Sequence, residues 1–144
     1  MITSAEEFIA LRSSSIKSEY DRAATEEAPI SVWREVIKKY PDYRRWVSHN
    51  KSVPLEILEE LCQFDSTIRQ FVAAKRKLSP AMFEVLSRDE SYVVRIAVAA
   101  NKKAPIAVLE RLLNDESKHV SRAARYNLDD TINKKDKENG CEDL

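Results

Sequence analysis

Two histidines and two cysteines are the residues of this sequence best suited to metal binding or nucleophilic catalysis. His49 and His119 are 70 residues apart, and neither has a glutamate or cysteine at the spacing of a zinc motif such as His-Glu-x-x-His. Cys62 lies in an apolar helical pattern and is interpreted as a small core residue, whereas Cys141 lies in a polar tail and is interpreted as a free thiol. Two cysteines are also too few for a disulfide framework. We therefore expect neither a metal site nor a catalytic histidine or cysteine.

Other catalytic signatures are missing as well. The single glycine, Gly140, lies near the C-terminus, so the sequence has no glycine-rich loop that could cradle a phosphate or a dinucleotide. No Gly-x-Ser-x-Gly motif is present, and the adjacent acids at 59–60 and 129–130 are interpreted as solvated surface. The sequence thus predicts a protein that is not an enzyme and that needs no cofactor.

Length and composition favour a single domain. The 144 residues are enough to bury a hydrophobic core, and 33% of them are charged, which suits an elongated helical protein. Lys and Arg together number 24, as do Asp and Glu, so net charge points to no class of partner. No N-terminal apolar run resembles a signal peptide, and no stretch of about 18 apolar residues could span a membrane. We expect a cytoplasmic protein without a membrane partner.

The charges are distributed unevenly along the chain. Segments 43–53, 66–79, 92–104 and 117–128 contain 13 basic residues and no acid, and the segments that precede the last three of them are mainly acidic. If these segments stack in register, the protein has an acidic ridge and a basic ridge, and a ridge of one sign steers partners. The candidate partner-binding residues on the acidic ridge are Glu56, Glu59, Glu60, Glu84 and Glu110. The alternative candidates on the basic ridge are Arg44, Arg45, Lys75, Arg76, Lys77, Lys102 and Lys103.

A period of 25–26 residues organises the chain that must position these charges. Four similar segments begin at Tyr43, Ile68, Val94 and Val120, at intervals of 25, 26 and 26 residues. Each is preceded by a short helical pattern of apolar residues that opens with a proline, which is favoured in the first turn of a helix. The prolines are Pro29, Pro54, Pro80 and Pro105. The sequence therefore predicts four stacked helix pairs over 29–128.

The two ends of the sequence do not follow this period. Residues 1–28 are interpreted as an N-terminal helical cap, with Thr3 or Ser4 as its first capping residue and a run of three serines that breaks it into two helices. Residues 129–144 contain mixed charges and one central apolar residue, so we expect a disordered tail. The predicted domain thus covers 1–128.

The unit from Leu86 to Asn101 resembles HEAT-type repeats, and its short period and following proline resemble the leucine-rich repeat variant. The resemblance covers about residues 29–128 and implies an all-α fold, namely a short right-handed α-solenoid. In such repeats an aspartate that ends the first helix lies six residues before an arginine in the second, and Asp89 and Arg95 keep this spacing. We expect a partly buried structural ion pair between them, or a ladder of such pairs between repeats.

Two functions are compatible with such a protein. Small repeat proteins of this general kind occur among the immunity proteins of bacterial interbacterial toxins, so the resemblance implies a protein that binds a toxin and occludes its active site. A basic nuclease toxin would fit the acidic ridge. The alternative is a HEAT-like nucleic-acid-binding protein that uses the basic ridge, although these bases can also complement helix C-terminal dipoles. The zero net charge favours a protein partner over nucleic acid.

Overall fold

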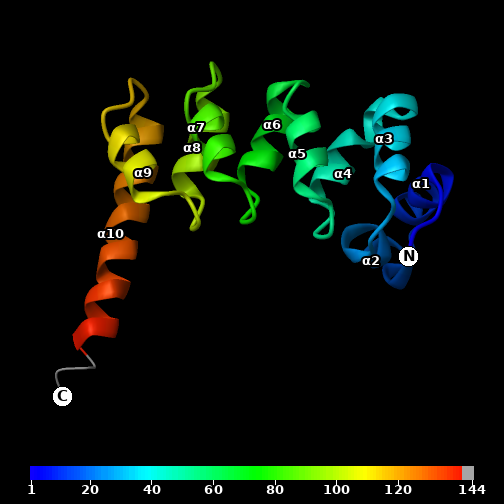
Figure 1. Ribbon diagram of the computed structural model, residues 1–144, viewed down its shortest axis with the longest axis horizontal. Coiled ribbons are helices and arrows are strands. Elements are labelled where there is room, and N and C mark those ends of the chain that lie inside the picture. Colours follow the sequence, from blue (N-terminus) through cyan, green and yellow to red (C-terminus); the bar gives the residue numbers. More distant parts are fainter. Residues whose placement is uncertain (141–144) are drawn as a thin grey trace. The chain divides into compact units, whose positions relative to one another are not determined.

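The computed structural model describes residues 1–140 and is all-α over that range (Figure 1). These described residues form ten α-helices, one short 3-10 helix and no strand. The elements are α1 (Ala5–Ser13), α2 (Lys17–Thr25), α3 (Ile30–Lys39), η1 (Pro41–Tyr43), α4 (Arg44–His49), α5 (Leu55–Leu61), α6 (Ser66–Ala73), α7 (Pro80–Ser87), α8 (Tyr92–Ala100), α9 (Ile106–Leu112) and α10 (Lys118–Gly140). The cysteine interpreted as a free thiol, Cys141, lies outside the described residues.

The chain forms two compact units, Met1–Val72 and a second that begins at Ala73. In the first unit α3 packs against α1, α4 and α5, and α2 packs against α1 and α4. In the second unit α7 and α10 each pack against α8 and α9. Each unit therefore has its own set of helix-to-helix contacts.

Helix α1 begins with the predicted capping interaction. The Ser4 hydroxyl accepts a hydrogen bond from the Glu7 amide at 3.0 Å, and the Glu7 carboxylate accepts one from the Thr3 amide at 3.2 Å. These bonds satisfy amides that the first turn of a helix leaves without partners. The predicted break is also confirmed, since α1 ends at Ser13 and α2 begins at Lys17.

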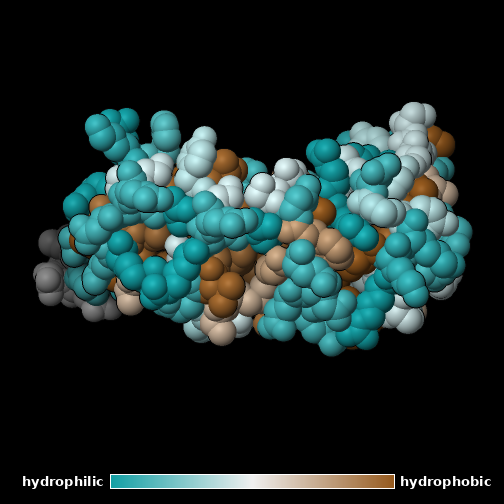
Figure 2. Space-filling model, turned by 90° about the horizontal axis from the view of Figure 1, so that it is seen from above, coloured by the Kyte–Doolittle hydropathy of each residue, from teal (hydrophilic) through white to brown (hydrophobic). Residues whose placement is uncertain are grey.

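Most positions of the apolar faces predicted for the first helix of each pair are buried, but Cys62, interpreted as a core residue, is only half-buried. Leu58 on α5 and Leu109 on α9 are at most 1% exposed. Phe8 of α1 meets Trp33 of α3 edge to face, with ring centroids 5.2 Å apart, and both side chains are fully buried. A fully buried leucine or phenylalanine contributes about 1.5–3 kcal/mol to folding. Hydrophilic residues cover most of the surface visible in Figure 2, with hydrophobic residues showing between them.

Three buried asparagines tie neighbouring helices together. The Asn101 amide donates to the carbonyl oxygens of Ala73 and Lys75, both at 2.8 Å. Asn127 donates in the same way to two carbonyls at the end of α8, at 2.9 and 2.8 Å. In the first unit Asn50 donates to two carbonyls at the end of α2, at 2.8 and 3.0 Å. One amide thus supplies two donors to carbonyls that a helix end leaves without partners.

An arginine provides a second recurring contact. Arg44, Arg69 and Arg95 each donate from the second helix of a pair to a main-chain carbonyl at or just beyond the end of the first helix. Arg95 also forms a bidentate ion pair with Asp115, with nitrogen–oxygen distances of 2.9 and 3.2 Å. The two side chains are only 10% and 9% exposed. Arg95 therefore links α8 to the turn that follows α9.

The prediction of an ion pair between the Asp89 and Arg95 side chains is wrong, because Arg95 bonds to the main chain of Asp89 and not to its carboxylate. Arg95 donates to the main-chain oxygen of Asp89 at 2.7 Å, and the Asp89 carboxylate accepts a bond from the Ser91 amide at 2.9 Å. The six-residue spacing does bring the two residues together. The carboxylate, however, is engaged at the start of α8, where helix amides lack partners. Pairing between successive helix pairs is confirmed for Arg95 and Asp115.

The end of the described chain differs from the expected disordered tail. Helix α10 continues without a break from Lys118 to Gly140, past the predicted boundary. Leu128 is 6% exposed, and the Thr131 hydroxyl donates within the helix to the Asn127 carbonyl at 2.9 Å. Packing and hydrogen bonding at the start of this segment therefore continue the helix, although its composition alone suggested disorder. The last four residues of the expected tail lie outside the described residues.

Replacing Asn101 with alanine is expected to lower the free energy of unfolding by about 2–3 kcal/mol, because two carbonyls lose their donor at a buried site. Urea denaturation followed by far-ultraviolet circular dichroism measures the change. Asn114→Ala removes an exposed asparagine after α9 and is the matched control, with an expected change below about 0.5 kcal/mol. Equal unfolding midpoints for the two variants would contradict a structural role of the Asn101 amide.

Replacing Asp115 with alanine is expected to cost about 3–5 kcal/mol, because it leaves the buried Arg95 guanidinium without its carboxylate. The double variant Arg95→Met/Asp115→Ala is expected to lose less than the sum of the single losses, since the stranded charge is gone. Thermal and urea unfolding give the values. Glu35→Gln breaks an exposed pair with Lys39 and is expected to cost only about 0–1 kcal/mol. Strictly additive losses at 95 and 115 would show that the two side chains act independently.

Candidate functional site

The acidic candidates of the first unit surround an arginine of α3. Arg34 contacts Glu60 at 2.7 Å and Glu56 at 3.4 Å, so its guanidinium bridges α3 and α5. The hydrogen bond to Glu60 is the main cause that raises the pKa of Arg34. Glu59 is exposed and forms no ion pair within the described residues. Two of these three acids are therefore already paired inside the unit.

The acidic candidates of the second unit show the same division. Glu84 of α7 contacts Arg111 of α9 at 2.9 Å and Arg88 at 3.6 Å. Glu110 is exposed and has no ion-pair partner in the described part of the chain. Because cross-helix ion pairs neutralise most of the predicted acidic ridge, Glu59 and Glu110 remain as its unpaired members.

Among the basic candidates, Arg44 has a structural position. It is half-buried, and its Nε donates to the Ile37 carbonyl oxygen at 2.7 Å. Its guanidinium lies 4.0 Å from the ring centre of Phe64. These contacts hold α4 against the end of α3. Arg44 therefore has a structural role and contributes little to a binding surface.

The five remaining bases after α6 and α8 lie in two adjacent turns of the second unit. The Asn101 amide joins these turns by its bond to the Lys75 carbonyl at 2.8 Å. Lys102 contacts Asp130 at 3.2 Å, and hydrogen bonds from Lys102 and Lys134 lower the pKa of Asp130. The turns thus form a basic edge that α10 neutralises in part. The bases on this edge are Lys75, Arg76, Lys77, Lys102 and Lys103.

Arg45 belongs to a cluster of cations and aromatic rings that sequence reasoning did not find. Its guanidinium lies 4.7 Å from the ring centre of Trp46 and 5.8 Å from that of Phe71. Arg12 stacks on the same indole at 3.4 Å. The ring centre of His49 lies 5.3 Å from that of Trp46 and 4.4 Å from that of Phe71. We call these five residues the Trp46 cluster.

Three helices of the first unit build the Trp46 cluster. Arg45, Trp46 and His49 lie on α4, where residues four apart share one helix face. Arg12 comes from the last turn of α1, and Phe71 comes from α6. Arg45 and His49 are exposed, and the other three residues are half-buried. The cluster is therefore a surface feature with partly buried rings at its base.

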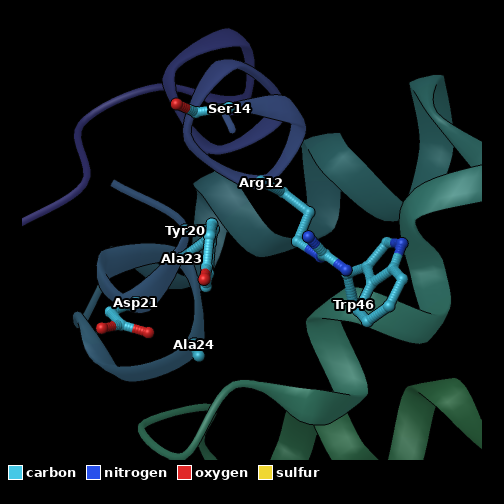
Figure 3. Close-up of a pocket in the computed structure, with 7 residues that line it drawn as sticks. All are labelled: Arg12, Ser14, Tyr20, Asp21, Ala23, Ala24 and Trp46. Atoms are coloured by element: carbon cyan, nitrogen blue, oxygen red, sulfur yellow. The ribbon is translucent and has the colours of Figure 1, made fainter. Parts of the chain in front are cut away.

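A pocket of about 450 Å³ lies beside Trp46 (Figure 3). Its lining residues are Arg12, Ser14, Tyr20, Asp21, Ala23, Ala24 and Trp46. The Arg12 side chain reaches from α1 to the Trp46 indole, and the Asp21 carboxylate points away from both. Asp21 instead accepts a hydrogen bond from Lys17 at 2.7 Å. Its charge is thus already compensated by a lysine of the same helix.

The guanidinium groups of the cluster keep their hydrogen-bond donors available. Arg12 and Arg45 form no hydrogen bond or ion pair within the described residues, in contrast to Arg34 and Arg95. Stacking occupies the flat face of a guanidinium and leaves the N–H donors on its edges free. Arg12, which lines the pocket, can therefore bind a carboxylate or another anion there, and Arg45 offers further donors beside the same indole.

The sequence contained one signal for this cluster. Trp46 and Phe71 occupy the position of the period at which the later units have Ala97 and Ala123. Two large rings in place of alanine indicate that α4 and α6, the second helices of the first unit, have a role beyond close helix packing. Arg12 gave no signal, because it belongs to the segment outside the period.

The second unit offers a weaker candidate. A pocket of about 430 Å³ is lined by Tyr92 and His119, whose ring centres are 6.2 Å apart, and by Arg95, which Asp115 already holds.

No group of three or more His, Cys, Asp or Glu among the described residues could hold a metal ion. None of the described helices has the length and apolar character needed to cross a membrane. Comparisons with protein-family models, curated proteins and solved structures gave no match.

Proposed function

We propose that this protein is a non-catalytic binding protein and that the Trp46 cluster contacts a protein partner. The observation that carries the proposal is the pair of guanidiniums, Arg12 and Arg45, stacked on Trp46 without a carboxylate partner in the described chain. Tryptophan and arginine are enriched in the hot spots of protein interfaces. The His49 ring packs against Trp46 and Phe71, which suits a contact residue more than a proton-transfer group.

Within this proposal the helix pairs form a short right-handed α-solenoid of about four repeats behind an N-terminal cap. The recurring bonds of Asn50, Asn101 and Asn127 support a repeated unit, since each amide contacts carbonyls at the end of an earlier helix. The period of 25–26 residues supports it as well. A solenoid presents side chains at regular spacing along an extended surface, which suits partner binding.

The most concrete form of the proposal is an immunity protein that acts in the cytoplasm and neutralises a bacterial toxin by covering its active site. The resemblance to small repeat proteins of this class supports it. A nuclease toxin would offer a basic surface to an unpaired acid such as Glu59 of the first unit. The Trp46 cluster would supply the anchor, because buried aromatic contacts lengthen the residence of a complex more than charges at its rim do.

Nucleic-acid binding is the second candidate, and the basic edge of the second unit favours it. Five bases in two adjacent turns could contact phosphates, with an affinity that falls steeply as salt rises. Two observations weigh against it. The net charge is zero, and Asp130 partly neutralises Lys102. A gel shift at low salt that is lost in Lys102→Ala/Lys103→Ala would favour this candidate over protein binding.

Removing the Arg12 and Trp46 side chains is expected to weaken partner binding without unfolding the protein. Wild-type protein and the variant Arg12→Ala/Trp46→Ala are used to capture partners from the source cell, and the captured partner is purified and titrated by calorimetry. We expect the variant to bind about 30-fold more weakly, since hot-spot residues are worth roughly 2 kcal/mol or more. Circular dichroism verifies that the variant is folded.

The matched control is Arg122→Ala/Tyr126→Ala, which removes the same kinds of side chain from an exposed face of α10. This control is expected to bind like the wild type. An equal loss in both variants, or no stoichiometric protein partner, would contradict the proposed function. A partner without toxic activity would remove only the immunity hypothesis.

A further inference from the structure

We infer that the pocket beside Trp46 binds an acidic–apolar segment of the partner protein: an apolar side chain enters the pocket, and a neighbouring carboxylate binds Arg12. This inference rests on the proposed function and names the chemistry of the partner at that site. It commits to a protein segment as the occupant. Single-stranded nucleic acid, the competing occupant, becomes an outcome of the test.

The walls of the pocket favour an apolar side chain. The ring of Trp46, the methyl groups of Ala23 and Ala24, and the side chain of Tyr20 make up most of its lining. A volume of about 450 Å³ lies within the roughly 300–1,000 Å³ typical of binding pockets and can admit one large side chain. A pocket with an aromatic wall and apolar lining can take up such an anchor residue.

The positive charge of Arg12, which lines the pocket, selects an acidic neighbour for that anchor. The Arg12 guanidinium lies 3.4 Å from the indole centre and the Arg45 guanidinium lies 4.7 Å from it, so both are fixed beside the same ring. Their edge donors match the two oxygens of a carboxylate. The one acid that lines the pocket, Asp21, is bonded to Lys17 at 2.7 Å and does not compete for them. Charge complementarity therefore favours an aspartate or glutamate of the partner.

The same geometry disfavours stacked bases. A platform for single-stranded nucleic acid needs open aromatic faces on which successive bases can lie. Here two guanidiniums approach the Trp46 ring, and the His49 ring centre lies 4.4 Å from that of Phe71. The rings are therefore already in contact with side chains of the protein itself. A carboxylate needs only the guanidinium edges, which remain free.

The test uses fluorescein-labelled nonapeptides as probes and fluorescence anisotropy as the readout. The central residue is Leu, Ile, Phe or Trp, and the flanking residues are Glu or Asp. Two matched sets replace the acids by Gln or Asn, or the central residue by Ala. We expect at least one acidic–apolar peptide to bind in the micromolar range, and at least 10-fold weaker binding of its counterparts in both matched sets.

Variants of the full chain assign the binding to the site. Trp46→Ala and Arg12→Ala are each expected to weaken the best peptide at least 10-fold, and Tyr126→Ala is expected to leave it unchanged. Arg12→Lys keeps the charge but loses the planar fork, so we expect an intermediate loss. No binding by any acidic–apolar peptide, equal binding of the Gln/Asn set, or tighter binding of an oligothymidine probe would each overturn the inference.

Failure of this inference can be distinguished from failure of the proposed function. If no peptide binds but the captured partner still requires Arg12 and Trp46, the Trp46 cluster remains the partner surface and only its acidic–apolar preference is wrong. If the captured partner binds equally well without the cluster, the proposed function itself is wrong.

Discussion

The buried asparagine amide is the contact on which the arrangement of helices depends. A helix end leaves carbonyls without partners, and removing them from water unpaired is costly. One amide satisfies two of them at once, as Asn101 does for Ala73 and Lys75. Its oxygen also accepts a bond from the Lys103 amide at 2.9 Å, so the same side chain shapes the turn that leads to α9. The Asn101 side chain thus fixes both the distance between two neighbouring helix pairs and the direction in which the chain enters α9.

Arginines add ion pairs to this arrangement. These ion pairs determine which charged groups remain available to a partner. Arg95 donates to the main-chain oxygens of Asp89 and Glu90 and to the Asp115 carboxylate. Arg34 on α3 pairs with Glu60 on α5, and Arg111 on α9 pairs with Glu84 on α7. Most carboxylates of the predicted acidic ridge are therefore held in ion pairs within the protein. Arg12 and Arg45 lie outside this scheme and stack on Trp46.

Sequence reasoning predicted the parts of the fold that depend on local pattern. Prolines and apolar spacing gave the first helices, including the buried Leu58 and Leu109, and the serine run gave the break after α1. It did not predict which acids are paired, because Arg34 and Glu60 lie 26 residues apart and meet only through helix packing. The pairing of Arg95 with Asp115 was missed because the two residues lie 20 positions apart, and the Asp89 carboxylate is instead bonded to the Ser91 amide.

The Trp46 cluster shows how a departure from a repeated pattern can create a site. The later second helices carry Ala97 and Ala123 at this position, whereas the earlier ones carry Trp46 and Phe71, and all four residues are half-buried. Arg12 and Arg45 contact the Trp46 ring without supplying an internal ion pair. The aromatic residues and their two unpaired cations are therefore better explained by a surface that another molecule completes.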